Sequence, residues 1–299
     1  MSSVRGVITT AGWLQLLGSV VLLSSAWPIT KVAIAAGAAP LWFAAGRAGF
    51  SGLTAVVVLG IAGRLRWPGQ RDLPALFAVG LLQLAAFFAF AHEAVRWVAA
   101  GRTTILANVT TIFIVPLSLL VLHEAISWRR WVAAGLGVLG AAVLIGPWSI
   151  DWTDRDVLIG HFFLLGAAFA FAIAIIVVRA APPRLSMLQL LPWCFGVATV
   201  ALVPLAVWHG GGVGTWGDTA LWSMLYIGGL AGPVGTWCVM QVAATMPAMV
   251  ASVGLLMTPA AGLLLATLWL HEPLGADLLA GSALILAGVA FAAWPARRK

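Results

Sequence analysis

The sequence predicts an all-α integral membrane protein with ten transmembrane helices, arranged as two inverted five-helix repeats. Three observations predict this fold: the composition, a series of apolar segments, and an internal repeat. Of the 299 residues, 62% are hydrophobic and 8% are charged, whereas roughly a quarter of the residues of a soluble domain carry charge. A soluble fold of this composition could not cover its own surface.

Ten apolar segments have the length of a membrane-spanning helix, because about 30 Å of hydrocarbon requires roughly 20 helical residues. They are runs of Leu, Ala, Val and Gly without the alternation of barrel strands, which favours helices. The first segment, after Arg5, also resembles a signal peptide, but nine further spans favour an uncleaved helix. The predicted helices cover residues 12–33, 40–61, 73–92, 103–122, 130–148, 158–178, 186–208, 220–241, 248–270 and 276–295.

The basic residues sort by loop, which predicts the orientation in the membrane. With the N-terminus in the cytoplasm, eleven Lys and Arg residues fall on the inner side and four on the outer side, while Arg47 lies inside the second helix. This asymmetry predicts a multi-pass protein of the bacterial inner membrane with both termini in the cytoplasm. The net charge of +7 therefore reflects membrane loops and does not indicate binding to nucleic acid. The inner residues are Arg5, Arg64, Arg66, Arg71, Arg129, Arg130, Arg179, Arg184, Arg297, Arg298 and Lys299, and the outer ones are Lys31, Arg96, Arg102 and Arg155.

A shift of 148 residues superposes the first five segments on the last five without a gap. Because each half contains an odd number of helices, the second half enters the membrane upside down. Transporters use this plan to obtain alternating access from one structural unit. The sequence therefore predicts two halves, residues 1–150 and 151–299, with a substrate path between them. The superposed pairs include Lys31 with Arg179, Gly80 with Gly228, His123 with His271, Glu124 with Glu272 and Gly140 with Gly288.

The closing segments of the two halves carry the most specific motif. They read LVLHEAISWRRWVAAGLGVLGAAVLIGP and TPAAGLLLATLWLHEPLGADLLAGSALILAGVAF, and both resemble the EamA-type repeats of the drug/metabolite transporter superfamily. Pro259 stands thirteen residues before Glu272, as in that pattern, whereas the first half has Thr111 in the place of the proline. Of the opening W-G-x-x-F-x-x-x-K pattern the chain keeps Trp27, in the Phe position, and Lys31.

The overall plan is also similar to that of the YddG-type aromatic amino-acid exporters of this superfamily. That resemblance implies ten helices, a central cavity lined mainly by helices 1, 3, 4, 6, 8 and 9, and export of amino acids.

Polar and aromatic side chains at helical spacing within the spans are the candidate substrate-binding residues. Spacings of three or four place such residues on one helix face, as for Gln83, Phe87 and Phe90 on the third helix. Aromatic walls with a few amide and hydroxyl groups suit a zwitterionic amino acid with an apolar side chain. Ordinary packing, or an aromatic belt at the membrane interface, is the alternative explanation for each position. The candidates are Ser24, Trp27, Gln83, Phe87, Phe90, Asn108, Thr111, His161, Trp237 and Gln241.

The charged residues near the spans have both functional and structural explanations. Lys31 and Arg47 could each offer a cation to a substrate carboxylate. Snorkelling explains Lys31 equally well, and a bond to helix-end carbonyls explains Arg47. The two His-Glu pairs are interpreted as caps of the helices that follow them, because inversion places one pair on each side of the membrane and no third metal ligand stands near either. Cys194 and Cys238 are interpreted as small buried hydrophobes.

Absences narrow the predicted function. No Asp or Glu lies in the central part of any predicted span, which disfavours exchange of organic cations for protons. The sequence has no P-loop and no clustered nucleophile and base. It therefore predicts a secondary exporter of amino acids, aromatic ones first, or of related small metabolites, acting as a monomer without a cofactor, a bound metal or catalytic residues.

Other functions remain open alternatives. These are export of nucleosides, sugars or drugs, a membrane-embedded transferase whose only candidate site is His92, Glu93 and Arg96, and a receptor or assembly protein without transport. The repeat favours transport, because a symmetric pair of halves has a use in alternating access and none in catalysis.

Overall fold

The structure, a computed structural model, describes residues 10–123, 128–145, 154–209, 212–246, 254–255 and 257–293. Within these ranges the chain is almost entirely helical and contains no strand. The α-helices are α1 (Thr10–Ala35), α2 (Pro40–Ile61), α3 (Leu73–Phe77), α4 (Phe87–Ala94), α5 (Ala100–Leu106), α6 (Thr111–Leu122), α7 (Trp128–Ile145), α8 (Arg155–Ala180), α9 (Met187–Trp208), α10 (Asp218–Met224), α11 (Gly232–Thr245), α13 (Met257–Leu270) and α14 (Ala276–Ala293).

Six helical stretches of the described chain are long and apolar enough to cross a membrane. The all-helical class and the presence of several candidate spans agree with the sequence prediction, while the total of ten spans stays a prediction. The long stretches are Thr10–Ala35, Pro40–Ile61, Gln70–Ala94, Arg155–Ala180, Met187–Trp208 and Asp218–Val242, and the shorter apolar helices are Ile112–Leu122, Trp131–Val143, Met257–Leu270 and Ala276–Gly288.

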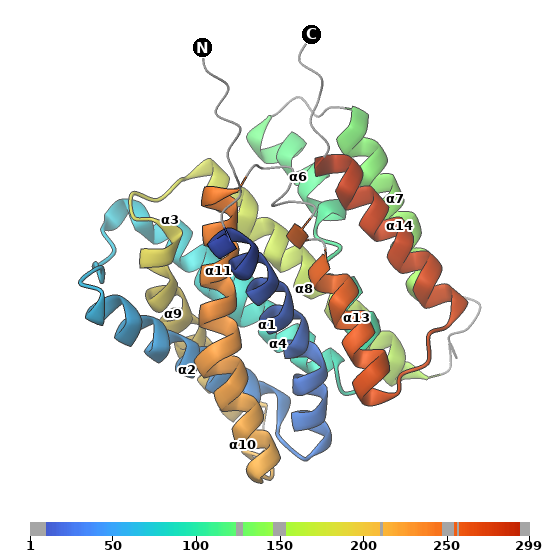
Figure 1. The fold of residues 1–299 in the computed structure, drawn as a ribbon, viewed down its shortest axis with the longest axis horizontal. Coiled ribbons are helices and arrows are strands. Elements are labelled where there is room, and N and C mark those ends of the chain that lie inside the picture. The colour runs from blue at the N-terminus through green and yellow to red at the C-terminus, as the bar shows by residue number, and fades with distance from the viewer. Residues whose placement is uncertain are drawn as a thin grey trace.

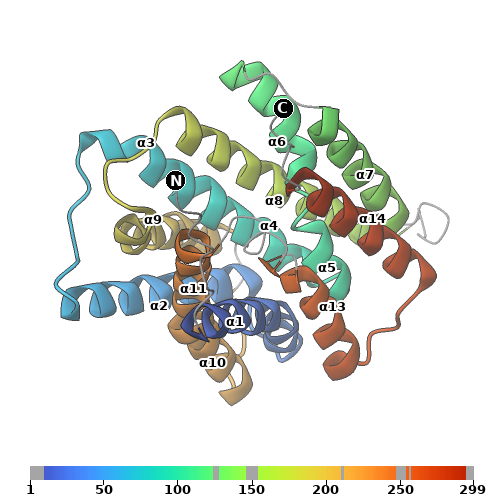
Figure 2. The same cartoon turned by 45° about the horizontal axis from the view of Figure 1, so that its top comes forward.

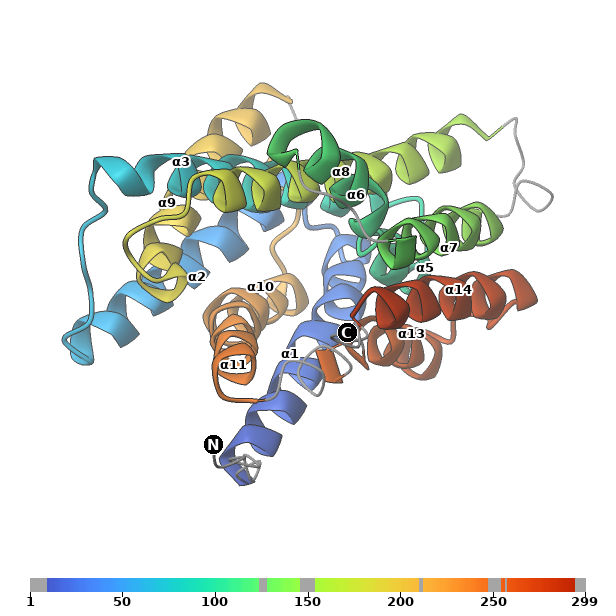
Figure 3. The same cartoon turned by 90° about the horizontal axis from the view of Figure 1, so that it is seen from above.

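The helix α1 runs between two groups of helices and packs against α11 and α13. From above, α2 and α9 lie on one side of it, and α7, α13 and α14 lie on the other (Figure 3). The helices α7 and α14 run side by side at one edge (Figure 1). The start of α1 and the end of α14 lie at the same end of the bundle (Figure 1).

The predicted fourth helix, residues 103–122, is interrupted between α5 and α6. The side-chain amide of Asn108 donates to the carbonyl of Thr104 at 2.6 Å, in the place where a helical N–H would bind. The backbone N–H of Asn108 turns instead to the carbonyl of Ile105 at 3.0 Å. An Asn side chain that competes for backbone carbonyls in this way loosens the helix, so the break follows from the residue type.

Two π-helical segments lie at equivalent places of the repeat. The first, Ala78–Ala86, joins α3 to α4, and the second, Leu225–Ala231, joins α10 to α11. The second segment ends next to Pro233, which has no N–H to donate. The third predicted helix of each half is therefore irregular at the same place. Such π-helical turns are frequent at functional sites.

Equivalent glycines of the two halves each pack against a helix of the other half. A Cβ added to Gly80 would lie 2.7 Å from the Cβ of Val197 in α9, and one added to Gly228 would lie 2.8 Å from the Cβ of Phe50 in α2. Each of these irregular helices therefore packs closely on the second helix of the other half. The pair Gly140 and Gly288 behaves alike, because a Cβ on either would lie within 3 Å of a carbonyl oxygen of the other helix.

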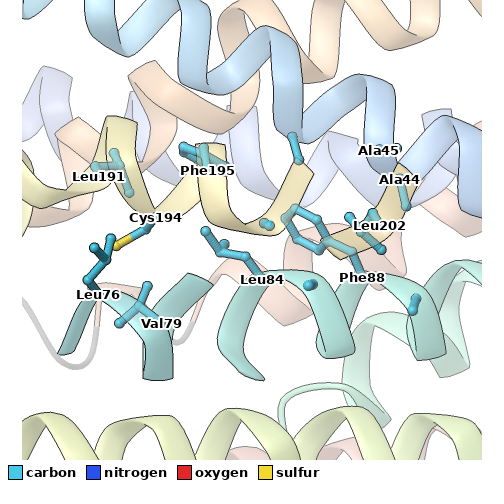
Figure 4. Close-up of a cluster of buried hydrophobic side chains, with 14 of the residues drawn as sticks. Ala44, Ala45, Leu76, Val79, Leu84, Phe88, Leu191, Cys194, Phe195 and Leu202 are labelled. Carbon is cyan, nitrogen blue, oxygen red and sulfur yellow. The ribbon is translucent and has the colours of Figure 1, made fainter. Parts of the chain in front are cut away.

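The largest buried apolar cluster lies where α2, the Leu73–Ala94 stretch and α9 meet (Figure 4). Small residues on α2, Ala44 and Ala45, let the larger side chains of Phe88 and Leu202 approach its backbone. Cys194 lies in the same cluster as a free, buried thiol, in agreement with its interpretation as a small hydrophobe.

Asp72 joins the segment after α2 to the segment after α8. Its carboxylate accepts hydrogen bonds from the backbone N–H groups of Gly69 at 2.8 Å, Arg184 at 2.7 Å and Leu185 at 3.0 Å. The loop after α2 is thereby joined to the loop after α8. The sequence does not predict this role of Asp72, because Asp72 lies outside every motif of the sequence.

We expect Gly228→Ala to lower the free energy of unfolding by about 1–3 kcal/mol, because the new methyl group would overpack the contact with α2. The matched control is Gly60→Ala in α2, where an added Cβ meets nothing within 4 Å. It should be neutral, or stabilising by at most about 1 kcal/mol through helix propensity. Unfolding in mixed micelles measures both; equal stabilities of the two variants would contradict the close packing.

Candidate functional site

A half-buried arginine, Arg47, and a fully buried histidine, His92, meet between α2 and α4. The Nη1 atom of Arg47 lies 3.3 Å from Nε2 of His92. The Nδ1 atom of His92 lies 2.7 Å from the carbonyl oxygen of Phe88, one turn earlier. A neutral imidazole satisfies both contacts when Nδ1 carries the hydrogen and donates to the carbonyl, because Nε2 then accepts from the guanidinium.

The guanidinium of Arg47 has no anionic partner among the described residues. No carboxylate of that part of the chain lies within 4.0 Å of it, and its Nε is buried without a hydrogen-bond partner. Its Cζ lies 4.2 Å from the centre of the Phe88 ring, a cation–π contact that offsets only part of the desolvation of a charge. The site therefore holds a half-buried positive charge without an anionic partner in the described part of the chain.

Aromatic rings surround this charged pair. The Trp27 ring centre lies 6.4 Å from that of His92 and 6.1 Å from that of Phe87, the latter edge to face. The ring centre of Phe43 lies 5.9 Å from that of His92, and the ring centre of Phe171 in α8 lies 5.5 Å from that of Phe87. The aromatic groups of α1, α2, α4 and α8 thus form one connected wall. We call this wall, together with Arg47 and His92, the Arg47 site.

Besides Phe171, the second half of the chain contributes Tyr226 next to the aromatic wall. Its hydroxyl lies 2.9 Å from that of Ser25 in α1, and it packs on the same apolar cluster as Phe43. Tyr226 belongs to the π-helical segment Leu225–Ala231 and is the only tyrosine of the sequence. Both halves therefore contribute to the surroundings of Arg47.

Of the predicted substrate-binding residues, Trp27 and Phe87 come together in the Arg47 site. Gln83 lies one turn before Phe87, half-buried and without a hydrogen-bond partner in the described chain. Ser24 is buried and donates to the carbonyl of Val21 in its own helix at 3.3 Å. Phe90 is stacked on Phe163 of α8 at 5.7 Å, so its ring is occupied by packing.

The other predicted residues lie apart from Arg47. Asn108 is exposed at the break between α5 and α6, and the side chain of Thr111 lies outside the described residues. His161 of α8 faces a pocket near the start of α14. Trp237 lines a pocket shared with α2 and α9, and Gln241 is half-buried one turn further along α11.

Sequence reasoning missed the partners of Arg47. His92 was considered only for a transferase, together with Glu93 and Arg96. In the structure His92 faces Arg47, whereas Glu93 pairs with Arg96 at 3.3 Å beside a separate pocket of about 340 Å³. Arg47 itself is a signal of the site, because it is a charge inside a predicted span. Its partner His92 lies 45 residues away in the sequence, and no local pattern predicts that pairing.

Two charged residues satisfy the backbone at the turn between α4 and α5. The Nζ of Lys31 donates to the carbonyls of Val95 and Val98, the second at 3.1 Å. The Glu272 carboxylate accepts from the N–H groups of Ala100 at 2.7 Å and Gly101 at 2.8 Å. Glu272 is thus a helix cap as expected, but it caps α5 in the other half rather than the helix that follows it, α14.

The histidines of the repeated pairs adopt the same unusual backbone. His123 and His271 have φ angles of 51° and 55°, the left-handed conformation that ends a helix. Glu124, the counterpart of Glu272, lies outside the described residues. Nearby, Arg102 of α5 forms an ion pair with Asp277 of α14. In the described chain no three His, Cys, Asp or Glu side chains gather as a metal site would require.

Comparison with known proteins gives the family. The sequence pattern described as "EamA-like transporter family" matches residues 10–146 and again residues 158–294. An uncharacterized transporter of Bacillus subtilis is 24% identical over 80% of this chain and 78% of its own length. A protein of Streptantibioticus cattleyicolor, described as a probable terminal-alkyne amino-acid exporter, is 25% identical over 94% of this chain and 93% of its own. A crystal structure with 18% identity has the same fold, with a TM-score of 0.64 over 95% of this chain and 96% of that chain.

We expect Glu272→Gln to destabilise the protein by about 1–2 kcal/mol, because it replaces two charge-assisted hydrogen bonds by one neutral bond and one unpaired N–H. The ranking of transported substrates should stay unchanged. Asp218→Asn is the matched control, since Asp218 also stands in the first turn of a helix but is exposed and makes no capping bond. A stable Glu272→Gln protein with an altered substrate ranking would contradict the capping role.

Proposed function

The chain belongs to the EamA-like transporter family, and from this we propose that it exports amino acids or related small metabolites, aromatic amino acids first, by alternating access. Membership of the family and the apolar helices make it a multi-pass membrane protein with a small-molecule substrate. The substrate and the direction of transport are our proposal.

The observation that carries the substrate class is the unpaired guanidinium of Arg47. A charge in the membrane interior is costly unless it is paired, and its nearest polar partner, His92, is satisfied in the neutral form. A substrate carboxylate would supply the missing anion through charge-assisted hydrogen bonds. Trp27 and Phe87 would then receive the side chain, and the free amide of Gln83 would be available to the polar end of the molecule.

A zwitterionic amino acid supplies the carboxylate that Arg47 lacks, and the side-chain amide oxygen of Gln83 would accept a hydrogen bond from its ammonium group. A sugar or a neutral nucleoside would leave Arg47 unpaired, and an organic cation would be repelled by it. The relative described as an amino-acid exporter matches nearly the full length of the chain, which supports the same substrate class.

We further propose ten transmembrane helices in two inverted halves, residues 1–150 and 151–299, in a monomer with both termini in the cytoplasm of a bacterium. The two family matches are offset by the same 148 residues as the sequence repeat, and the glycine contacts between the halves support a pseudo-two-fold relation. The eleven-to-four distribution of basic residues supports the orientation.

We expect Arg47→Gln to reduce counterflow of labelled phenylalanine in proteoliposomes by about tenfold or more. A charge-assisted hydrogen bond is worth about 1.5–3 kcal/mol, and about 1.4 kcal/mol corresponds to tenfold. Arg47→Lys should retain part of the activity. Arg71→Gln, an exposed change in the short 3-10 helix Gln70–Asp72, should retain all of it.

A substrate analogue separates loss of the carboxylate contact from general damage. The wild-type protein should prefer phenylalanine over phenylalaninol, which lacks the carboxylate, and Arg47→Gln should lose this preference. If the variant folds and keeps both wild-type counterflow and the preference, Arg47 does not bind the substrate carboxylate.

Single cysteines at Asp154 and Arg66 test the orientation, in a background where Cys194 and Cys238 are replaced by Ala. In intact cells a membrane-impermeant maleimide should label Asp154→Cys, in the loop expected outside. Arg66→Cys should react only after the cells are opened. The reverse pattern would overturn the orientation and with it the placing of the termini.

A further inference from the structure

A lateral pocket of about 310 Å³ lies between α2, α9 and α11, away from Arg47 and its aromatic wall. Figure 2 shows these three helices next to one another. The walls are apolar, with Val58 and Leu59 from α2, Leu191 from α9, and Pro233 and Trp237 from α11. The pocket opens sideways, because Val58 is 56% exposed and Trp237 is 39% exposed on its rim.

The pocket lies at membrane depth. Its walls belong to three of the stretches that are long and apolar enough to span a bilayer. An apolar opening on that surface faces lipid hydrocarbon rather than water. A flexible acyl chain can fill such a slot, whereas an amino acid would leave its ammonium group without a partner there.

One end of the pocket carries a cation, Arg64. The left-handed turn at Gly63, with a φ of +64°, ends α2, and the N–H of Arg64 then donates to the carbonyl of Leu59 at 2.8 Å. This capping turn fixes the backbone of Arg64 at the mouth of the slot. The Arg64 side chain is exposed, and no carboxylate of the described chain lies within 4 Å of it.

We propose that this pocket binds an anionic phospholipid, with one acyl chain in the slot and the phosphate on Arg64. The charge complementarity selects the headgroup, since an unpaired guanidinium at the end of an apolar slot matches a phosphate at the end of a chain. Arg66, Arg71 and Arg184 fall, with Arg64, in segments that the sequence predicts on the inner side, and they would add to the attraction for anionic lipid. Trp237 then contacts lipid rather than transported substrate.

The bound lipid bridges the two halves of the chain. The α2 wall belongs to the first half, and the α9 and α11 walls belong to the second. A chain that contacts all three helices stabilises their present arrangement by mass action, because it binds this arrangement and not the unfolded protein. The proposal concerns a separate site and does not depend on the identity of the transported substrate.

Native mass spectrometry and thermal unfolding of the full-length protein in detergent test the proposal with phosphatidylglycerol and phosphatidylcholine of identical chains. The wild-type protein should retain phosphatidylglycerol more tightly and gain more thermal stability from it. Arg64→Gln should weaken phosphatidylglycerol binding about fivefold, the loss expected for one basic side chain near an anionic surface. Arg71→Gln, an equally exposed change outside the pocket, should weaken it much less.

A second variant tests the slot itself. Val58→Trp, on the exposed rim, should fill the slot and remove the tight binding of phosphatidylglycerol while the protein stays folded. Arg47→Gln should leave lipid binding unchanged, which keeps this test distinct from the test of transport. Equal retention of both lipids by the wild type, equal losses in Arg64→Gln and Arg71→Gln, full binding by Val58→Trp, or displacement of the lipid by phenylalanine would each overturn the proposal.

Discussion

Polar groups inside an apolar bundle must find their partners within the protein, because lipid offers none. This constraint is most visible at the turn between α4 and α5, where a helix ends and the next one begins. Lys31 of α1 satisfies the carbonyls of Val95 and Val98, and Glu272 of the second half satisfies the N–H groups of Ala100 and Gly101. One cation and one anion, each far away in the sequence, therefore hold the same turn.

Arg47 stands out because it does not follow this constraint. The ammonium of Lys31 is bound by carbonyls, and Arg102 is paired with Asp277. Arg47 has a neutral imidazole and the face of Phe88 instead. In a bundle that otherwise satisfies its buried charges, an incomplete one is best explained by a partner that comes and goes. The substrate carboxylate that we propose would be such a partner. When it leaves, the guanidinium is again unpaired, and the cost of that unpaired charge would favour binding of the next substrate.

The sequence predicts the all-helical class and the bounds of several helices, but not the partners that their polar residues find. The second segment was predicted over residues 40–61, and α2 spans Pro40–Ile61, because apolar length and Pro40 are local signals. The break at Asn108 was missed because a mid-helix Asn can also point away from its own backbone. Glu272 was recognised as a cap, but its target lies 171 residues away at Gly101. Which helix it meets depends on packing between the halves, and no spacing rule contains that information.

The π-helical segments connect the repeat to the Arg47 site. Gln83, which we propose for the polar end of the substrate, belongs to the first segment, and Tyr226, which packs on the same cluster as Phe43, belongs to the second. π-Helical turns inside α-helices are frequent at functional sites. Gly228, also in the second segment, lies so close to α2 that an added Cβ would be 2.9 Å from the carbonyl oxygen of Arg47. A movement of the second half against α2 would therefore displace the backbone of Arg47. In this way a relative movement of the two halves would change the exposure of the Arg47 side chain.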